Sequence, residues 1–185
     1  MHRNIIIITG TPGTGKTTIA IALSKRINAK LIAVNDLIKH KKLYMGYSDD
    51  GAMMAKLPEL KREILREIAR EKNKTVILEG HLLSDISIKG ACVIVMREHL
   101  KTLLSRLKKR GYPVSKIRDN MVSEAIGYCS DSSRKHYDEV HDVMSGKNAI
   151  TTVLGILTNK RQHTKSIDLS YELEYMLKKN PKYFI

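Results

Sequence analysis

Short apolar runs along the chain predict the strands of a buried sheet. Residues 4–9, 31–34, 75–79 and 92–96 form such runs, each four to six residues long and mostly aliphatic. Runs of this length without an alternating polar side are typical of parallel strands covered on both faces. A weaker run over residues 139–144 is the candidate for a fifth strand.

Helices are predicted between these strands. Ile19, Leu23 and Ile27 recur every four residues, so a helix over residues 16–27 has one apolar face. Strands that alternate with helices at this spacing form βαβ units, and we predict an α/β fold with a parallel sheet between helices. The other predicted helices are 58–72, opened by Pro58 and ended by Asn73, 100–110, ended by Gly111, 114–137, one capped by Asn148, and 167–179.

The segment GTPGTGKT, residues 10–17, matches the phosphate-loop pattern G-x-x-x-x-G-K-S/T. A buried strand leads into it and an amphipathic helix leads out, which is the context that the pattern requires. Backbone amides of such a loop and the helix N-terminus bind phosphate oxygens. Lys16 would add a full charge for the β- and γ-phosphates, and the Thr17 hydroxyl would ligate Mg²⁺. We therefore predict a P-loop NTPase with three layers and a five-stranded parallel sheet.

The chain is strongly basic. It has 185 residues, with 33 Lys and Arg against 19 Asp and Glu, a formal charge of +14. This excess favours polyanionic partners such as nucleotides, RNA or a ribosomal particle, although a basic proteome would give the same balance. No segment approaches the roughly 20 apolar residues of a membrane span. Cys92 and Cys129 belong to no CxxC pair, so we predict no zinc site and an intracellular, cytoplasmic location.

A small kinase fits these features better than a GTPase. Neither Asn73-Lys74-Thr75-Val76 nor Asn159-Lys160-Arg161-Gln162 completes the guanine-reading N-K-x-D pattern, and no D-x-x-G follows the strand at 75–79. A kinase of this size needs an acceptor pocket and a mobile lid that carries arginines.

The lid and the acceptor side can both be placed. Arg106 and Arg110 are four residues apart in a basic helix, so they share a face and could reach the same phosphates, and Gly111 offers a hinge. The neighbouring lysines fit a solvated face. The acceptor side is expected in a helix that Asn35 or Asp36 caps, and in an irregular segment over residues 43–56.

Several motifs then agree in order and spacing with one family. GTPGTGKTT, VNDLI, GYSDD, VILEGHLLSD, VIVMREH, RLKKRGY, KIRDN and SEAI together resemble the adenylate kinase isoenzyme six family, also called coilin-interacting nuclear ATPase protein, in its archaeal form. The resemblance spans about residues 5–147. It implies a nucleoside-monophosphate-kinase-like fold with an NMP-binding segment at about 34–57 and a lid at about 109–119. We expect residues 1–158 to form the kinase domain and 159–185 an extension packed on it.

The resemblance also implies two activities. One is a broad-specificity nucleoside monophosphate kinase that uses Mg²⁺ with ATP to catalyse ATP + AMP = 2 ADP. The other is an ATPase that acts in maturation of the small ribosomal subunit, through a platform protein of that subunit and its precursor particle. In the second reading hydrolysis drives release of a ribosomal protein, and AMP phosphorylation is incidental. The expected state is a monomer or a heterodimer with the ribosomal protein, away from membranes.

The predicted site residues fall into four groups. ATP would be bound by Gly13, Thr14, Gly15, Lys16, Thr17, Thr18, Arg106, Arg110 and Lys147. The monophosphate would be bound by Asn35, Asp36, His81 and Arg97. Thr17 and Glu79 would hold the metal ion. The catalytic residues would be Lys16, Glu79, His81 and Arg110.

The stretch VILEGHLLSD supplies the least usual of these residues. In a P-loop fold the strand at 75–79 lies beside the phosphate-loop strand, so its carboxyl end faces the metal and phosphates. Glu79 would bind Mg²⁺ through water or orient the attacking group, and Gly80 would allow a tight turn. His81 stands near the place where ordinary adenylate kinases carry an arginine. Our hypothesis is that it contacts phosphate or positions water, against the simpler reading that it caps the strand end.

Overall fold

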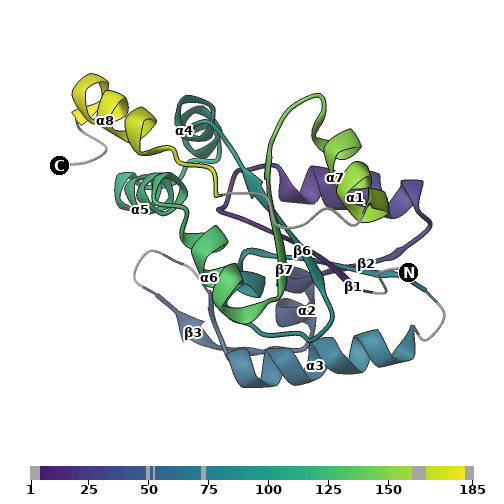
Figure 1. Cartoon of the computed structure of the whole chain (residues 1–185). Coiled ribbons are helices and arrows are strands. Elements are labelled where there is room, and N and C mark those ends of the chain that lie inside the picture. The colour runs from purple at the N-terminus through teal and green to yellow at the C-terminus, as the bar shows by residue number, and fades with distance from the viewer. Residues whose placement is uncertain (1–4, 49–50, 52, 72–73, 160–165, 182–185) are drawn as a thin grey trace.

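The protein forms a three-layer α/β structure. The computed structural model describes residues 5–48, 51, 53–71, 74–159 and 166–181. Within these residues the central sheet has five strands in the order β2-β5-β1-β6-β7, and each neighbouring pair is parallel (Figure 1). The predicted P-loop architecture is therefore confirmed, including its weakest strand. The strands are β1 (Ile5–Thr9), β2 (Lys30–Ala33), β5 (Val76–Glu79), β6 (Cys92–Arg97) and β7 (Glu139–Met144).

Helices cover both faces of the sheet. Alternate side chains of β1 point to opposite layers: Ile6 and Ile8 pack on one face and Ile7 on the other. The first face is covered by α1 (Lys16–Arg26) and α7 (Ala149–Asn159). The second is covered by α2 (Val34–His40), α3 (Leu57–Arg70), α6 (Tyr128–His136) and the 3-10 helix η1 (His81–Asp85). No helix among the described residues is long and apolar enough to cross a membrane.

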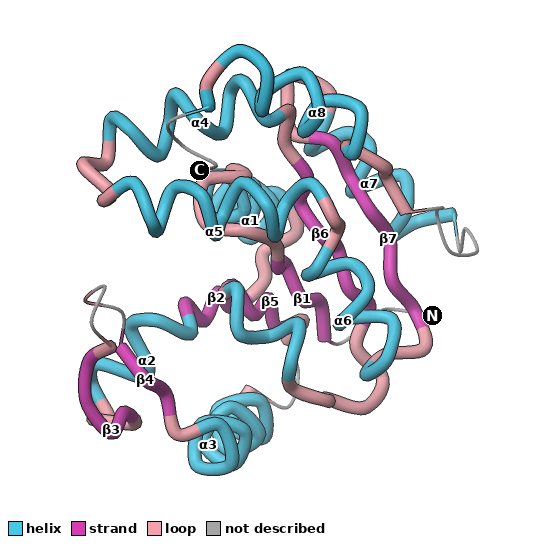
Figure 2. The backbone as a smooth tube through the Cα atoms, turned by 90° about the vertical axis from the view of Figure 1, so that its left-hand side faces the viewer, coloured by secondary structure: helices cyan, strands magenta, loops and turns pink. Residues whose placement is uncertain are grey.

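A separate group of helices lies beyond the carboxyl end of β6. It consists of α4 (Leu100–Lys109), α5 (Val114–Ala125) and α8 (Ser170–Lys179) (Figure 2). These helices share an apolar cluster. Leu169 and Met176 bring the C-terminal segment into that cluster. Glu172 of α8 also caps α4: its carboxylate accepts the Leu100 amide at 2.8 Å and contacts Nδ1 of His99 at 2.6 Å. These contacts hold α8 against α4 and α5.

The structure differs from the predictions in three segments. The segment 43–56, predicted to be irregular, contains two strands among its described residues: β3 (Tyr44–Tyr47) and β4 (Met53–Ala55) pair as an antiparallel hairpin. The helix predicted over 114–137 is broken at Gly127, whose φ of +70° is left-handed. Asn35 and Asp36 lie inside α2 and do not cap it. The predicted helix stop at Asn73 falls outside the described residues.

Arg97 at the end of β6 lies in a fully buried polar cluster, with a side chain 1% exposed. Its Nε donates to Oε1 of Glu124 at 2.9 Å, and its Nη1 donates to Oδ2 of Asp142 at 3.0 Å. Further bonds reach Ser130 and the carbonyl oxygens of Glu124 and Ile167. One guanidinium therefore joins β6 to α5, α6, β7 and the segment before α8. A buried pair of this kind is strongly destabilised when one partner is removed.

We expect Arg97→Met to destabilise the fold by about 3–5 kcal/mol, because the Glu124 carboxylate would remain buried without its cation and Asp142 would lose this cation and keep its pair with Arg134. Equilibrium urea unfolding measures this loss. The matched control is Arg62→Met, which breaks an exposed pair with Glu59 at 3.8 Å and should change stability by less than about 1 kcal/mol. Equal effects of the two substitutions would contradict the role given to Arg97.

Candidate active site

The loop between β1 and α1 depends on close backbone approach. A Cβ at Gly10 would lie 2.4 Å from the carbonyl oxygen of Met96, and Gly15 has a left-handed φ of +87° just before α1. Both positions therefore require glycine. Thr14 is fully buried, and its hydroxyl and its amide both donate to the carbonyl of Thr11, at 2.9 and 3.2 Å. Thr14 thus braces the loop and does not line the cavity.

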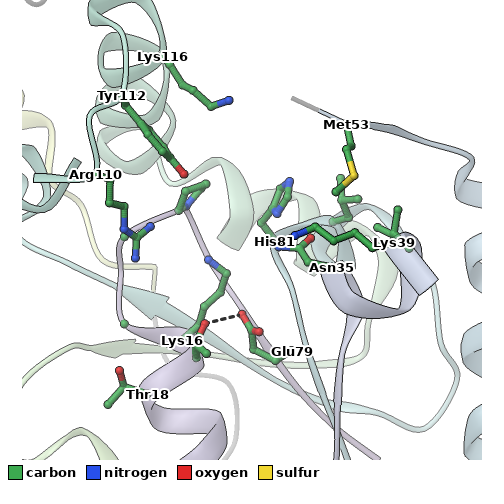
Figure 3. A pocket seen from close by; sticks show the side chains of 16 residues that line it. Lys16, Thr18, Asn35, Lys39, Met53, Glu79, His81, Arg110, Tyr112 and Lys116 are labelled. Atoms are coloured by element: carbon green, nitrogen blue, oxygen red, sulfur yellow. Dashed lines mark hydrogen bonds between the residues drawn. The ribbon is translucent and has the colours of Figure 1, made fainter. Parts of the chain in front are cut away.

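Lys16, Thr17 and Glu79 come together at the start of α1. The Lys16 ammonium donates to the carbonyl of Thr11 at 3.3 Å. The Thr17 hydroxyl donates to Oε1 of Glu79 at 3.2 Å, the bond drawn as a dashed line in Figure 3. The register explains this meeting, because Glu79 of β5 lies opposite Ile8 of β1. Strand ends in this arrangement place an acid next to the phosphate loop.

Burial controls the charges of this group. Desolvation lowers the pKa of Lys16, and the nearby Glu79 carboxylate partly opposes that shift. Desolvation likewise raises the pKa of Glu79, while Lys16 and the hydrogen bond from Thr17 act to lower it. Both residues are less than a tenth exposed. The nearby charge of each residue is the main influence that favours the charged form of the other, and a bound metal ion and phosphates would favour both charged forms further.

His81 follows Glu79 after one glycine and faces the same cavity (Figure 3). Its carbonyl accepts the hydroxyls of Thr9 and Ser84, at 3.2 and 2.9 Å, which fixes the backbone. Gly80 is needed for a different reason from the predicted tight turn. Its φ of 164° is extended, but a Cβ there would lie 2.9 Å from Cβ of Val34. The start of α2 packs directly on this glycine.

A cavity of about 400 Å³ lies above the phosphate loop, lined by a floor and two facing walls. The floor is the loop itself with Glu79 and His81. One wall comes from α2 and the β3–β4 hairpin, and the opposite wall comes from the end of α4 and the start of α5 (Figure 3). Its volume suits a small-molecule ligand. The lining includes Pro12, Gly13, Gly15, Lys16, Thr17, Thr18, Asn35, Ile38, Lys39, Met53, Glu79, His81, Leu82, Arg110, Tyr112 and Lys116.

A second cavity adjoins the first and shares Gly13, Gly15, Thr18 and Arg110 with it. Its remaining lining residues are Ile19, Arg106, Ser145 and Gly146. Arg106 donates to the carbonyl of Gly13 at 2.8 Å and pairs with Glu98 at 2.7 Å. The two arginines predicted to share a helix face therefore both reach the phosphate loop. Arg110 opens to both cavities, whereas Arg106 opens only to the second.

Four of the predicted site residues lie elsewhere. The prediction that Arg97 binds the monophosphate is wrong, because its guanidinium is buried in the polar cluster with Glu124 and Asp142 and cannot reach a ligand in the cavity. Lys147 is exposed, and its neighbours Ser145 and Gly146 line the second cavity instead. Asp36 is exposed on α2 but close enough to raise the pKa of Glu79. Thr14 braces the loop, as described above.

Several lining residues were not singled out from the sequence. Lys39 lies one helical turn after Asn35, so the four-residue spacing in α2 could have revealed it. Tyr112 and Lys116 fall inside the predicted lid, where the Lys116 ammonium lies 5.3 Å from the centre of the Tyr112 ring. Met53 belongs to the hairpin, and no sequence signal for its position was available because the hairpin itself was not predicted.

The residues present fit a nucleoside triphosphate with Mg²⁺. The hydroxyl of Thr17 and the carboxylate of Glu79 are oxygen donors of the kind that Mg²⁺ prefers, and they already touch. Lys16 and Arg110 bring two cations to the cavity beside them.

Comparisons with known structures agree with this fold. A shikimate kinase from Acinetobacter baumannii in complex with shikimate aligns with a TM-score of 0.54 at 15% identity, covering 85% of this chain and 94% of the kinase. A gluconokinase from Sinorhizobium meliloti gives the same TM-score and identity, covering 95% and 98%. At these identities the likeness shows the fold alone.

Comparisons of sequence show the family. The family described as AAA domain matches residues 6–127. A protein of Methanosarcina acetivorans described as "Putative adenylate kinase" is 36% identical over 157 residues, 80% of this chain and 81% of the relative. A protein of Methanocaldococcus jannaschii with the same description is 31% identical over 164 residues, 88% and 91% of the two chains. The resemblance seen in the sequence is confirmed, and the chain belongs to this archaeal adenylate kinase family within the AAA-domain proteins.

Proposed function

We propose that the protein is a Mg²⁺-dependent nucleoside monophosphate kinase that converts ATP and AMP into two molecules of ADP. One observation carries the proposal: a single cavity joins the phosphate loop to a wall from α2 and the hairpin and to a wall from the lid. A donor and an acceptor can therefore meet above Lys16. The relatives' descriptions support a nucleotide kinase, and we propose AMP and other nucleoside monophosphates as its phosphoryl acceptors.

The chain would act mainly by holding charge in place. A phosphate oxygen of AMP attacks the terminal phosphorus of ATP, the bond to the bridging oxygen breaks, and ADP leaves. Lys16 from below and Arg110 from the lid would neutralise the transferring phosphoryl group, so no covalent protein intermediate is needed. Mg²⁺, held through Thr17 and Glu79, would supply further charge neutralisation. Lys39 and Asn35 would face the acceptor.

His81 differs from an arginine in the way it can act. Burial, together with the nearby Lys16 charge, lowers the pKa of His81 to about 4. The side chain is therefore neutral near pH 7 and offers a hydrogen bond, not a cation. We propose that it contacts a phosphate oxygen or the attacking group. A neutral group in this place would also allow a water molecule to be oriented, which supports ATP hydrolysis as a second activity.

A second candidate function is an ATP-driven assembly factor for the small ribosomal subunit. The formal charge of +14 favours it, because basic surfaces bind polyanionic particles. Hydrolysis would then drive release of a bound ribosomal protein. The two functions use the same phosphate loop and differ in whether AMP or a partner protein raises turnover.

We expect Lys16→Met to lower AMP-dependent ADP formation by about 10²–10³-fold, the loss typical of one electrostatic group at a transition state. Methionine keeps the buried stem of the side chain and removes its charge. A coupled assay with ATP and AMP, CMP or UMP measures the effect. Lys25→Met, in the exposed last turn of α1, is the matched control and should keep full activity. Retained turnover in Lys16→Met would refute the assignment of the phosphate loop.

We expect His81→Ala to lower both AMP phosphorylation and basal ATP hydrolysis, by about tenfold or more. One hydrogen bond to a charged group contributes about 1.5–3 kcal/mol. His81→Gln keeps a hydrogen-bonding side chain and should recover part of the loss. His136→Ala is the control, since that ring bonds the Ser132 carbonyl within α6 and lies outside the cavity. Unchanged rates in His81→Ala would show that the histidine only ends the strand.

The assembly role predicts that binding to small-subunit ribosomal particles weakens with added salt. Phosphate contacts release counterions, so the logarithm of the affinity should fall linearly with the logarithm of the salt concentration. Sedimentation with purified particles between roughly 50 and 200 mM salt, the range over which such contacts weaken strongly, measures it. Hydrolysis that rises only with the particle present would favour this role, whereas salt-independent binding would remove the electrostatic argument.

A further inference from the structure

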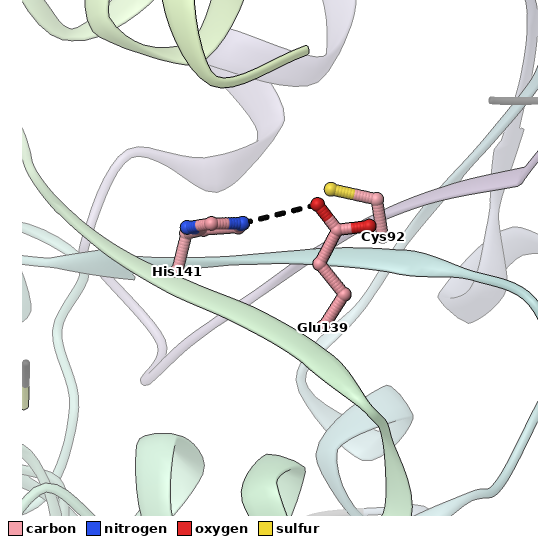
Figure 4. Close-up of side chains that lie close together, drawn as sticks. All are labelled: Cys92, Glu139 and His141. Carbon is pink, nitrogen blue, oxygen red and sulfur yellow. Dashed lines mark hydrogen bonds and ion pairs between the residues drawn. The ribbon is translucent and has the colours of Figure 1, made fainter. Parts of the chain in front are cut away.

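Three side chains of different chemistry meet at the amino-terminal edge of the sheet. Cys92 begins β6, Glu139 begins β7, and the two residues are direct partners in the parallel register. His141 is two residues further along β7, so it lies on the same face as Glu139. The Cys92 sulfur, a Glu139 carboxylate oxygen and a His141 ring nitrogen all lie within 4.8 Å of one another (Figure 4). Nε2 of His141 lies 3.2 Å from Oε1 of Glu139.

The surroundings of this cluster are mostly apolar. Cys92 is 1% exposed and His141 is completely buried, on the face that α1 and α7 cover. The Glu139 side chain is 32% exposed, so one side of the cluster opens to solvent. A buried thiol and imidazole beside a solvent-facing carboxylate leave a route by which an ion could enter.

We propose that Cys92, Glu139 and His141 bind a zinc ion. A thiolate, an imidazole and a carboxylate are the three ligand types that zinc sites use, and the sulfur and nitrogen donors disfavour Mg²⁺ and Ca²⁺. Coordination displaces the thiol proton of Cys92 to solvent. Three protein ligands leave a fourth position, which water can fill from the side of Glu139.

This site is separate from the phosphate loop. The loop follows the carboxyl end of β1, whereas Cys92 pairs with Ile6 near the start of that strand. Cys92 and Arg97 mark the two ends of β6, about 16 Å apart at roughly 3.3 Å per residue. The ion would join the starts of β6 and β7 and so stabilise the outer edge of the sheet. We therefore expect zinc to affect stability and to leave nucleotide binding intact.

The test uses the full-length protein after treatment with a chelator. Titration with Co²⁺, a spectroscopic substitute for zinc, should give one ion per chain and a thiolate-to-cobalt charge-transfer band that Zn²⁺ then abolishes. Cys92→Ser should remove the band, and His141→Gln should weaken binding by about 10–100-fold. Cys129→Ser, the matched cysteine control, and Lys16→Met should both bind as the unmodified protein does. The thermal unfolding midpoint should rise with Zn²⁺ only where the site is intact.

Two outcomes would overturn the proposal. One is the absence of a charge-transfer band at any cobalt concentration, which would leave the cluster as a hydrogen-bonded His141–Glu139 pair beside a packed thiol. The other is a band that survives in Cys92→Ser or disappears in Cys129→Ser. If Cys92→Ser or His141→Gln fails to fold, Glu139→Gln tests the site instead, because the Glu139 side chain is 32% exposed. Unaltered affinity in that variant would also count against the site.

Discussion

The parallel pairing of β1 with β5 is the constraint on which the functional part of the molecule depends. Glu79 lies opposite Ile8, so the strand that carries the acid ends beside the strand that leads into the phosphate loop. The hydrogen bond from Thr17 to Glu79 then follows from register. A shift of one residue would turn Glu79 to the other face of the sheet, because side chains alternate along a strand. The same register brings His81 to the cavity.

Much of this arrangement could be predicted from local sequence signals. The apolar runs and the glycine-rich loop each act over a few residues, and the strands and the loop lie where these signals predict. Arg106 and Arg110 both line the second cavity beside that loop. Arg97 is a residue whose role these local signals do not predict. It follows a buried strand near the site, as a ligand-binding arginine would, yet its partners Glu124 and Asp142 are 27 and 45 residues away. Only the packing of α5 and β7 reveals that both acids are buried beside it.

The same limit applies to Cys92. Spacing rules detect ligands that are close in sequence, and they gave no zinc site here. Residues 92 and 139 meet through strand register, which a single sequence does not display. The β3–β4 hairpin was missed for a related reason: its short strands gain their stability from pairing with each other and from packing on α2 and α3. Contacts between distant segments therefore account for most of what local patterns left out.

The capping of α4 by Glu172 limits how the lid can move. At its first turn this helix is held by the carboxylate of α8, and near its last turn Arg106 is bonded to Gly13. Both ends of a rod about 15 Å long are thus attached to the rest of the domain. A closing motion of the proposed lid would therefore have to begin after α4, at Gly111, whose φ is +68°. Arg110, which directly precedes this glycine, would then stay beside the phosphate loop in the open and in the closed position.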